Sequence, residues 1–570
     1  MQSGAPFVPA TLAQSDSRNG GSADVQSESS EWTTARVQSH SSDIDRTTAG
    51  LSEIDRHEKG GHEEKTLSIQ ASIRPALSPS AVSLCCTASE LVHEPPREEK
   101  SADPSAVAFE PDEETDPKNW SRGFRWYLTV LTGMLVLNST FASSAPAGIT
   151  EDTMKHFGVG PEVAVLCISL FVAGYCVGPL LWRPLSESYG RRPIFLLSFA
   201  IYTCFQVGCA LAPNTGVLLA FRFLSGTFAA APLTYSGAVI TDLWDVDTRG
   251  SAMALFGIAP FAGPSLGPIV SGFIQTAGAD WRWVYWVTTM FAGVCTLFIV
   301  FTLPETYGPI ILKKKAERLR KETGDGRWYA PIERHPHDTK TRFKDILLKP
   351  FIMLFLEPML MAVTIYMSFV YGIVYLLLEA YPSVFMANHG FTSAQNGLAF
   401  LGFFAGSVVC TFLCTLAEHR YQAAARRLAP LPVRPEKRLE MCALTGPLLV
   451  LALFWFGWTS APPIHWISPV LAGALIGVAA LGMFLSPFNH IIDSYLANAA
   501  SALAACTVVR SAFGAGFALF AGRMYAQLGT RWASSVLGFA ALLLAPVPLV
   551  LVRLGPRLRA RSRFTPAEGA

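Results

Sequence analysis

The stretch GPLLWRPLSESYGRR, residues 178–192, connects two long apolar segments and decides the fold of this chain. Gly190 allows a tight backbone turn, because glycine tolerates conformations that other residues avoid. Glu187 is placed to pair with Arg183 or Arg191. A short, charged connection between two apolar segments is typical of a hairpin of membrane helices. Further apolar segments of the same length are therefore expected on both sides of this stretch.

Apolar segments long enough to cross a bilayer recur along the whole body of the chain. The hydrocarbon core is about 30 Å thick and needs about 20 apolar residues per helix. Twelve segments meet this length: 125–147, 163–182, 193–211, 217–240, 251–274, 282–303, 351–378, 395–416, 440–459, 466–490, 501–522 and 531–553. We therefore predict an all-α integral membrane protein, with twelve transmembrane helices in two six-helix halves.

The composition separates a tail from this membrane body. Of the 570 residues, 51% are hydrophobic and 15% are charged, against about 25% charged residues in an average soluble protein. Residues 1–118 carry a net charge of −11 and the remainder +13. Eleven cysteines in 570 residues are too few for a secreted disulfide scaffold. The predicted parts are a disordered cytosolic N-tail (1–118), an N-terminal half (119–303), a cytosolic central loop (304–350), a C-terminal half (351–553) and a basic cytosolic C-tail (554–570).

The distribution of basic residues predicts the orientation. With the N-terminus in the cytosol, 29 lysines and arginines fall on the inner side and four on the outer side. Cytosolic loops of membrane proteins carry this excess of positive charge. Nothing near Met1 has the pattern of a cleaved signal peptide. We expect both termini in the cytosol and the plasma membrane as the location.

A weak internal repeat supports the division into halves. Residues 185–189 contain an acid and a basic pair follows at 191–192, and residues 416–420 contain an acid and a basic pair follows at 426–427. Two related halves are typical of transporters, whose substrate site lies between the halves near the middle of the membrane.

Three motifs resemble the major facilitator superfamily, and within it the twelve-helix drug:proton antiporters of fungi. They are the stretch 178–192, the stretch LAFRFLSG at 219–226 with a membrane-embedded arginine, and the stretch GIAPFAGPSLGP at 257–268. Shorter flanking matches are DPKNW at 116–120, LPETY at 303–307 and AASAL at 499–503. One departure is that Ser188 and Tyr189 stand where the family usually has a basic residue after the loop acid.

The resemblance implies a cytosolic gate and a bent fifth helix. The gate residues are Gly178, Arg183, Glu187, Gly190, Arg191, Arg192, Asp242 and Arg249. The antiporter motif consists of Gly257, Gly263, Pro264, Gly267 and Pro268. Simpler explanations are the ordinary excess of positive charge on the inner side for the first set and close helix packing for the second.

Charged residues inside or beside the spans are candidates for proton coupling, since a charge in the membrane is costly and normally faces a partner or a wet cavity. The candidates are Arg222, Glu357, Asp493 and Arg510. In the family, the arginine corresponding to Arg222 is implicated in proton transfer. Alternatively, Glu357 is an acid at a helix start and Arg510 pairs between helices.

Polar and aromatic residues in the spans are candidates for the substrate cavity, because amphipathic pockets with a few polar anchors suit organic ligands. We predict contributions from Asn138, Tyr235, Tyr366, Tyr371 and Asn489. Each of these side chains has packing as its alternative role.

The expected function is proton-coupled export of a small organic compound or secondary metabolite, such as an organic acid, a glycolipid, a toxin or a drug. The sequence has no phosphate-binding loop of the ATPase type, no metal-ligand spacing and no catalytic constellation. We therefore expect no enzyme activity, cofactor, metal or nucleic-acid partner, and a monomer whose partners are substrate, protons and lipid. Alternatives are a polyamine or multidrug exporter, proton-symport uptake, and a membrane sensor that does not transport. Two embedded arginines favour a neutral or acidic compound over a polyamine.

Overall fold

The computed structural model describes residues 105–110, 112–245, 248–333, 339–428 and 434–564. Most of the predicted N-tail and the end of the C-tail lie outside these residues. The described chain is helical, apart from turns and one isolated bridge between Ala106 and Tyr329. This agrees with the predicted all-α class.

The N-terminal half contains six membrane-length segments. Helix α2 begins after Ser121, whose hydroxyl accepts from the amide of Phe124, and α6 begins after Asn214, which caps Val217 in the same way. The helices are α2 (Arg122–Ser144), α4 (Pro161–Tyr189), α5 (Arg191–Ala210), α6 (Thr215–Leu243), α7 (Arg249–Phe256) continued by α8 (Ala259–Thr276), and α9 (Arg282–Thr302). The short elements η1 (Pro117–Asn119), η2 (Ala145–Ile149) and α3 (Thr150–Phe157) flank α2.

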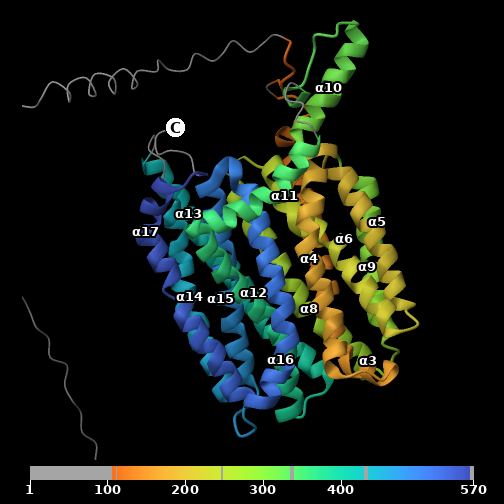
Figure 1. Cartoon of the computed structure of the whole chain (residues 1–570), viewed down its shortest axis with the longest axis vertical. Helices are drawn as coiled ribbons and strands as arrows, with labels where there is room; N and C mark the ends of the chain where they lie inside the picture. The colour runs from red at the N-terminus through yellow and green to blue at the C-terminus, as the bar shows by residue number, and fades with distance from the viewer. Residues whose placement is uncertain (1–104, 111, 246–247, 334–338, 429–433, 565–570) are drawn as a thin grey trace, which may run out of the picture. The chain divides into compact units, whose positions relative to one another are not determined.

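A central segment leads into the C-terminal half. It contains α10 (Gly308–Thr323), η3 (Pro331–Glu333) and α11 (Thr339–Leu356). The C-terminal half contains α12 (Pro358–Tyr381), η4 (Pro382–Asn388), α13 (Ser393–Leu428), η5 (Pro435–Leu439), α14 (Glu440–Thr459), α15 (Ile467–Tyr495), η6 (Leu496–Asn498), α16 (Ala499–Leu544) and α17 (Val547–Arg561). Figure 1 shows α4, α5, α6 and α9 together on one side and α12, α14, α15 and α17 on the other.

The number of spans agrees with the prediction of twelve. Among the described residues, eleven helical segments are long and apolar enough to cross a membrane, and the last of them runs from Ala499 to Arg561. At 1.5 Å per residue this segment would be about three bilayers long if it were straight. Gly529 interrupts it with a φ of +71°, a conformation that glycine adopts readily. The segment therefore supplies two spans.

Two predicted spans have different bounds in the structure. The seventh span begins at Pro358 and not at 351, because α11 continues to Leu356 and Glu357 is extended, with φ −105° and ψ 98°. The fifth span is divided into α7 and α8 at Gly257, next to Pro260, which has no amide hydrogen to donate.

The helix surfaces suit a lipid environment. Helix α9 exposes large apolar side chains along its length, including Trp283, Met290, Leu297 and Phe301. Water would disfavour such a surface, whereas hydrocarbon does not. The two halves pack through α4 against α16 and through α8 against α13.

The last residues of the predicted disordered tail are structured. Val107 donates its amide to the carbonyl of Tyr329 at 2.9 Å, and Lys315 of α10 forms a 2.7 Å ion pair with Glu113. The hydrogen bond from Lys315 lowers the pKa of Glu113 to about 2. The pair therefore stays ionised at neutral pH, so residues from 105 onward belong with the central segment and not with the tail.

Candidate functional site

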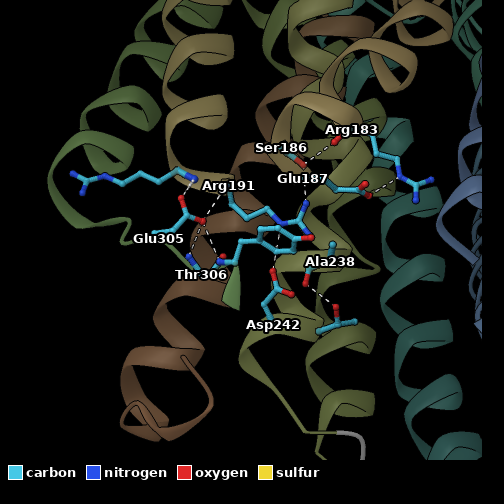
Figure 2. A network of polar contacts seen from close by, with 11 residues as sticks. Arg183, Ser186, Glu187, Arg191, Ala238, Asp242, Glu305 and Thr306 are labelled. Atoms are coloured by element: carbon cyan, nitrogen blue, oxygen red, sulfur yellow. Dashed lines mark hydrogen bonds and ion pairs between the residues drawn. The ribbon is translucent and has the colours of Figure 1, made fainter. Parts of the chain in front are cut away.

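One polar network joins α4, α5 and α6 at the end of the bundle that carries α10 (Figure 2). Arg191 is the centre of this network. Its Nε lies 3.3 Å from Oδ2 of Asp242, and another guanidinium nitrogen donates to Ser186 at 2.7 Å. Its guanidinium also lies over the ring of Tyr307, 4.5 Å from the centroid. The network therefore fixes the start of α5 against the end of α6.

Glu305 completes this network and was not among the predicted site residues. Its carboxylate accepts the amides of Arg191 at 2.8 Å and of Arg192 at 3.3 Å, which are donors at the start of α5. A carboxylate stabilises these free amides at a helix N-terminus. The signal in the sequence is the LPETY stretch at 303–307, which also carries part of the family resemblance. Gly190 is required here, since it has a φ of +99° and a Cβ would lie 2.3 Å from Glu305.

The predicted gate residues are only partly brought together. Arg191, Arg192 and Asp242 join the network, whereas Glu187 pairs with Arg183 within α4 at 3.1 Å. Arg249 forms no ion pair with the residues that the structure describes. Gly178 instead lets α4 approach α6, because a Cβ would lie 2.1 Å from that of Ala230. All of these contacts lie within the N-terminal half, so a latch between the halves remains a prediction.

The C-terminal half has a matching network. Arg438, just before α14, forms ion pairs with Glu418 of α13 and with Asp493 of α15, the latter at 2.5 Å. Its guanidinium lies over the ring of Tyr421, 4.1 Å from the centroid. Asp493 is thus bound to an arginine at a helix end, and its role in proton coupling remains a prediction.

The two networks correct the alignment of the internal repeat. Arg191 begins α5 and binds an acid at the end of α6, and Arg438 precedes α14 and binds an acid at the end of α15. The counterpart of Arg191 is therefore Arg438 and not the pair Arg426 and Arg427, whose side chains are exposed on α13. Sequence spacing missed it because the connection after α13 is longer than the connection after α4.

The antiporter motif packs α8 closely against two other helices. A Cβ at Gly263 would lie 2.0 Å from Thr140 Oγ1, and a Cβ at Gly267 would lie 2.1 Å from Ser144 Oγ, both on α2. Pro268 faces the other half, because its carbonyl lies 2.5 Å from the position of a Cβ on Gly397 of α13. Pro264 lies within α8, and Gly257 marks the break before it. Small residues thus allow close helix approach at these contacts.

Arg222 is fully buried in α6. Its Nε donates to the carbonyl of Cys167 at 2.6 Å, and a second nitrogen donates to the carbonyl of Ser143 at 3.4 Å. The guanidinium also lies over the ring of Phe171, 4.2 Å from the centroid. Among the described residues it forms no ion pair with a carboxylate. Carbonyl oxygens and an aromatic ring stabilise this charge in place of an acid.

Hydroxyl groups connect the surroundings of Arg222 to the other half. Ser143 Oγ lies 2.8 Å from the hydroxyl of Tyr375 on α12, and the hydroxyl of Tyr371 donates to that of Tyr375 at 3.4 Å. Arg510 of α16 lies over the ring of Tyr371, 4.8 Å from the centroid. A polar chain between the halves therefore links the two embedded arginines. Tyr375 joins this chain beside Tyr371 because the two tyrosines are one helical turn apart on α12.

Glu357 does not lie within a span. It is the residue before α12, and its carboxylate accepts from the hydroxyl of Ser562 at 2.8 Å and from the amide of Arg563 at 3.3 Å. Tyr495 is a third, longer contact at 3.5 Å. These contacts support the alternative role, an acid at a helix start, because they attach the end of the chain to α12.

We expect Glu357→Gln to keep export near the wild-type rate. The amide oxygen can still accept from Ser562, so only the charge is lost. The export rate is measured with a compound that moves against its concentration gradient. Limited proteolysis after α17 measures whether the segment around Ser562 stays attached to Glu357. Complete loss of export in correctly inserted protein would instead indicate that Glu357 takes part in proton coupling.

The predicted cavity residues are divided between the halves. Asn138 is buried in α2, and neither polar atom of its side chain has a partner among the described residues. Tyr235 packs on Phe195 of its own half, with 4.5 Å between the ring centroids. Tyr366 is buried in α12, and Asn489 is half-buried in α15. Of the five, only Tyr371 joins the polar chain between the halves.

Several fungal transporters are similar to this chain in sequence. Efflux pump FUBT of Fusarium oxysporum is 38% identical over 482 residues, which cover 83% of this chain and 80% of the pump. The citrinin biosynthesis cluster MFS transporter mrr1 of Monascus ruber is 39% identical over 457 residues, covering 80% and 91%. The major facilitator superfamily multidrug transporter mdrA of Aspergillus fumigatus is 39% identical over 478 residues, covering 82% and 77%.

A solved structure has the same fold. That of the proton:xylose symporter XylE bound to 6-bromo-6-deoxy-D-glucose superimposes with a TM-score of 0.54 at 15% identity, covering 76% of this chain and 96% of the symporter. The model of the Major Facilitator Superfamily matches residues 130–519, which include both polar networks, the antiporter motif and both embedded arginines. With twelve spans in two halves and these motifs in place, the chain belongs to the major facilitator superfamily.

Proposed function

We propose that this protein exports a small organic compound or secondary metabolite in exchange for protons. The observation that carries the proposal is the pair of embedded arginines, one in each half, linked by Ser143, Tyr375 and Tyr371. Transporters with two repeats bind their substrate between the halves. The relatives are named an efflux pump, a multidrug transporter and a biosynthesis-cluster transporter, and these names support export over uptake.

The contacts between the halves suit alternating access. At the end of the bundle that carries α3, Arg523 of α16 pairs with Glu162 of α4, and the amide of Ala394 donates to Thr276 at 3.1 Å. Both contacts join one half to the other, whereas the Arg191 and Arg438 networks each brace a single half. Each half is therefore built to move as a unit while the contacts between the halves break and form.

The proposed orientation places the α10 end in the cytosol, as the basic residues predict. Both termini would then be cytosolic, and the protein would act in the plasma membrane as a monomer. A proton enters from the outside and is released inside while the substrate leaves. Arg222 is the proposed coupling residue, and Asp493 and Arg510 are the other candidates.

Export should stop when the proton gradient collapses. The compound is first identified by mass spectrometry as one that accumulates in cells lacking the protein and leaves cells that express it. A protonophore is then added while ATP is held constant, and we expect loss of uphill export because protons supply the free energy. Continued uphill export would contradict proton coupling, and accumulation inside expressing cells would indicate uptake by symport instead.

A further inference from the structure

Arg510 lies where helices of both halves meet. The residue is 5% exposed, and its guanidinium lies over two aromatic rings, those of Tyr371 on α12 and Phe484 on α15. Each centroid is 4.8 Å from the central carbon of the guanidinium. Phe484 also contacts Phe261 of α8, with 5.5 Å between the centroids. The arginine therefore belongs to the surface between the halves and not to the interior of one half.

Arg510 has unused hydrogen-bonding capacity among the residues that the structure describes. It forms no ion pair with any residue that the structure describes, and its buried Nε has no hydrogen-bond partner. Arg222 differs, because two backbone carbonyls accept from it. A guanidinium has five N–H donors in one plane. Contact with the two rings uses none of these donors, so they remain for a ligand.

Three of the acids in or beside the spans have partners elsewhere. Glu357 accepts from the C-terminal segment, Asp493 is bound to Arg438, and Glu162 is bound to Arg523. A buried cation without a counterion is costly, and a negatively charged ligand offsets that cost. A cationic ligand would meet uncompensated repulsion at this position.

We propose that Arg510, Tyr371 and Phe484 bind the anionic group of the exported compound, an organic anion with a planar apolar part. The proposal rests on the proposed export function and specifies its substrate class. The guanidinium binds the anion through its edge, and the two rings pack against the planar part. The Tyr371 hydroxyl donates to Tyr375, which contacts Ser143 of the other half. Binding of the anion at Tyr371 therefore affects contacts between the halves that must change during transport.

Two probes of the same shape test the charge preference. The full-length protein is purified into lipid nanodiscs, and the affinities of naphthalene-1-carboxylate and of the uncharged naphthalene-1-carboxamide are measured by calorimetry without a proton gradient. We expect the carboxylate to bind about tenfold or more tightly, since hydrogen bonds to charged groups contribute about 1.5–3 kcal/mol and 1.4 kcal/mol is a factor of ten.

Variants test whether the preference for the carboxylate over the carboxamide depends on Arg510. Arg510→Gln should bind both probes about equally, and Arg510→Lys should keep part of the preference because the charge remains. The control is Arg531→Gln, an exposed arginine later in α16. Phe484→Leu keeps the charge of Arg510. It should therefore weaken the binding of both probes and preserve the ratio of their affinities. It also provides a test if Arg510→Gln does not fold.

Two results would overturn the proposal. One is equal affinity for the two probes in the unmodified protein, and the other is an intact preference in Arg510→Gln. Because binding is measured without a gradient, it is independent of proton-driven export. A protein that prefers the carboxylate but exports nothing would refute the proposed function and leave the anion site in place.

Discussion

Arg222→Ala should reduce proton-driven export about a hundredfold or more, because it removes two hydrogen bonds from a charged group, each of which contributes about 1.5–3 kcal/mol. The substitution removes the buried charge and frees the carbonyls of Cys167 and Ser143. Ser143 also contacts Tyr375 across the halves, so its position changes when Arg222 is lost. Export of the identified compound into an opposing concentration gradient measures the effect.

Arg222→Lys should lose most of the export as well. Lysine keeps the charge, but a single ammonium does not reproduce the planar set of donors that reaches two carbonyls and lies flat on Phe171. The matched control is Arg282→Gln, which removes an arginine beside Asp280 at the start of α9. It should export normally. Export by Arg222→Lys at the wild-type rate would show that only charge matters at this position.

Gly263→Ala should impair both stability and export. An added Cβ would lie 2.6 Å from the backbone nitrogen of Phe141 and 2.0 Å from Thr140 Oγ1. Backbone atoms cannot rotate away, so α8 must separate from α2, and overpacking of this kind costs about 1–3 kcal/mol. Since α8 also packs on α13 of the other half, we expect a lower melting temperature, slower export and greater proton leak.

The control for this prediction is Gly293→Ala on α9, where a Cβ would have no neighbour within 4 Å. There the substitution should be neutral or slightly stabilising, because alanine favours helices. Melting temperature in detergent and proton leak in liposomes compare the two variants directly. Equal behaviour of both variants would mean that α8 adjusts without cost and that the motif is not a tight seal.

The sequence by itself determined the class of the fold, the number of spans and the family. These depend on the length of apolar segments, on the side that carries basic residues and on short motifs, all of which are local properties of the chain. Arg222 was identified for the same reason, since a charge within an apolar segment is visible without a structure. The sequence placed the start of the seventh span at 351, too early. The end of α11 is apolar, so the apolar pattern begins before the break at Glu357.

Only the tertiary structure decided which side chains meet. Arg438 pairs with Asp493 across 55 residues, Glu305 caps a helix 114 residues earlier, and Glu357 contacts a residue 205 positions later. Such partners are set by how helices pack, and a helical pattern shows which residues share a face but not which helix lies opposite. For the same reason, the sequence placed Arg510 in a span, and the structure alone revealed the two rings that it contacts and the donor that has no partner among the described residues.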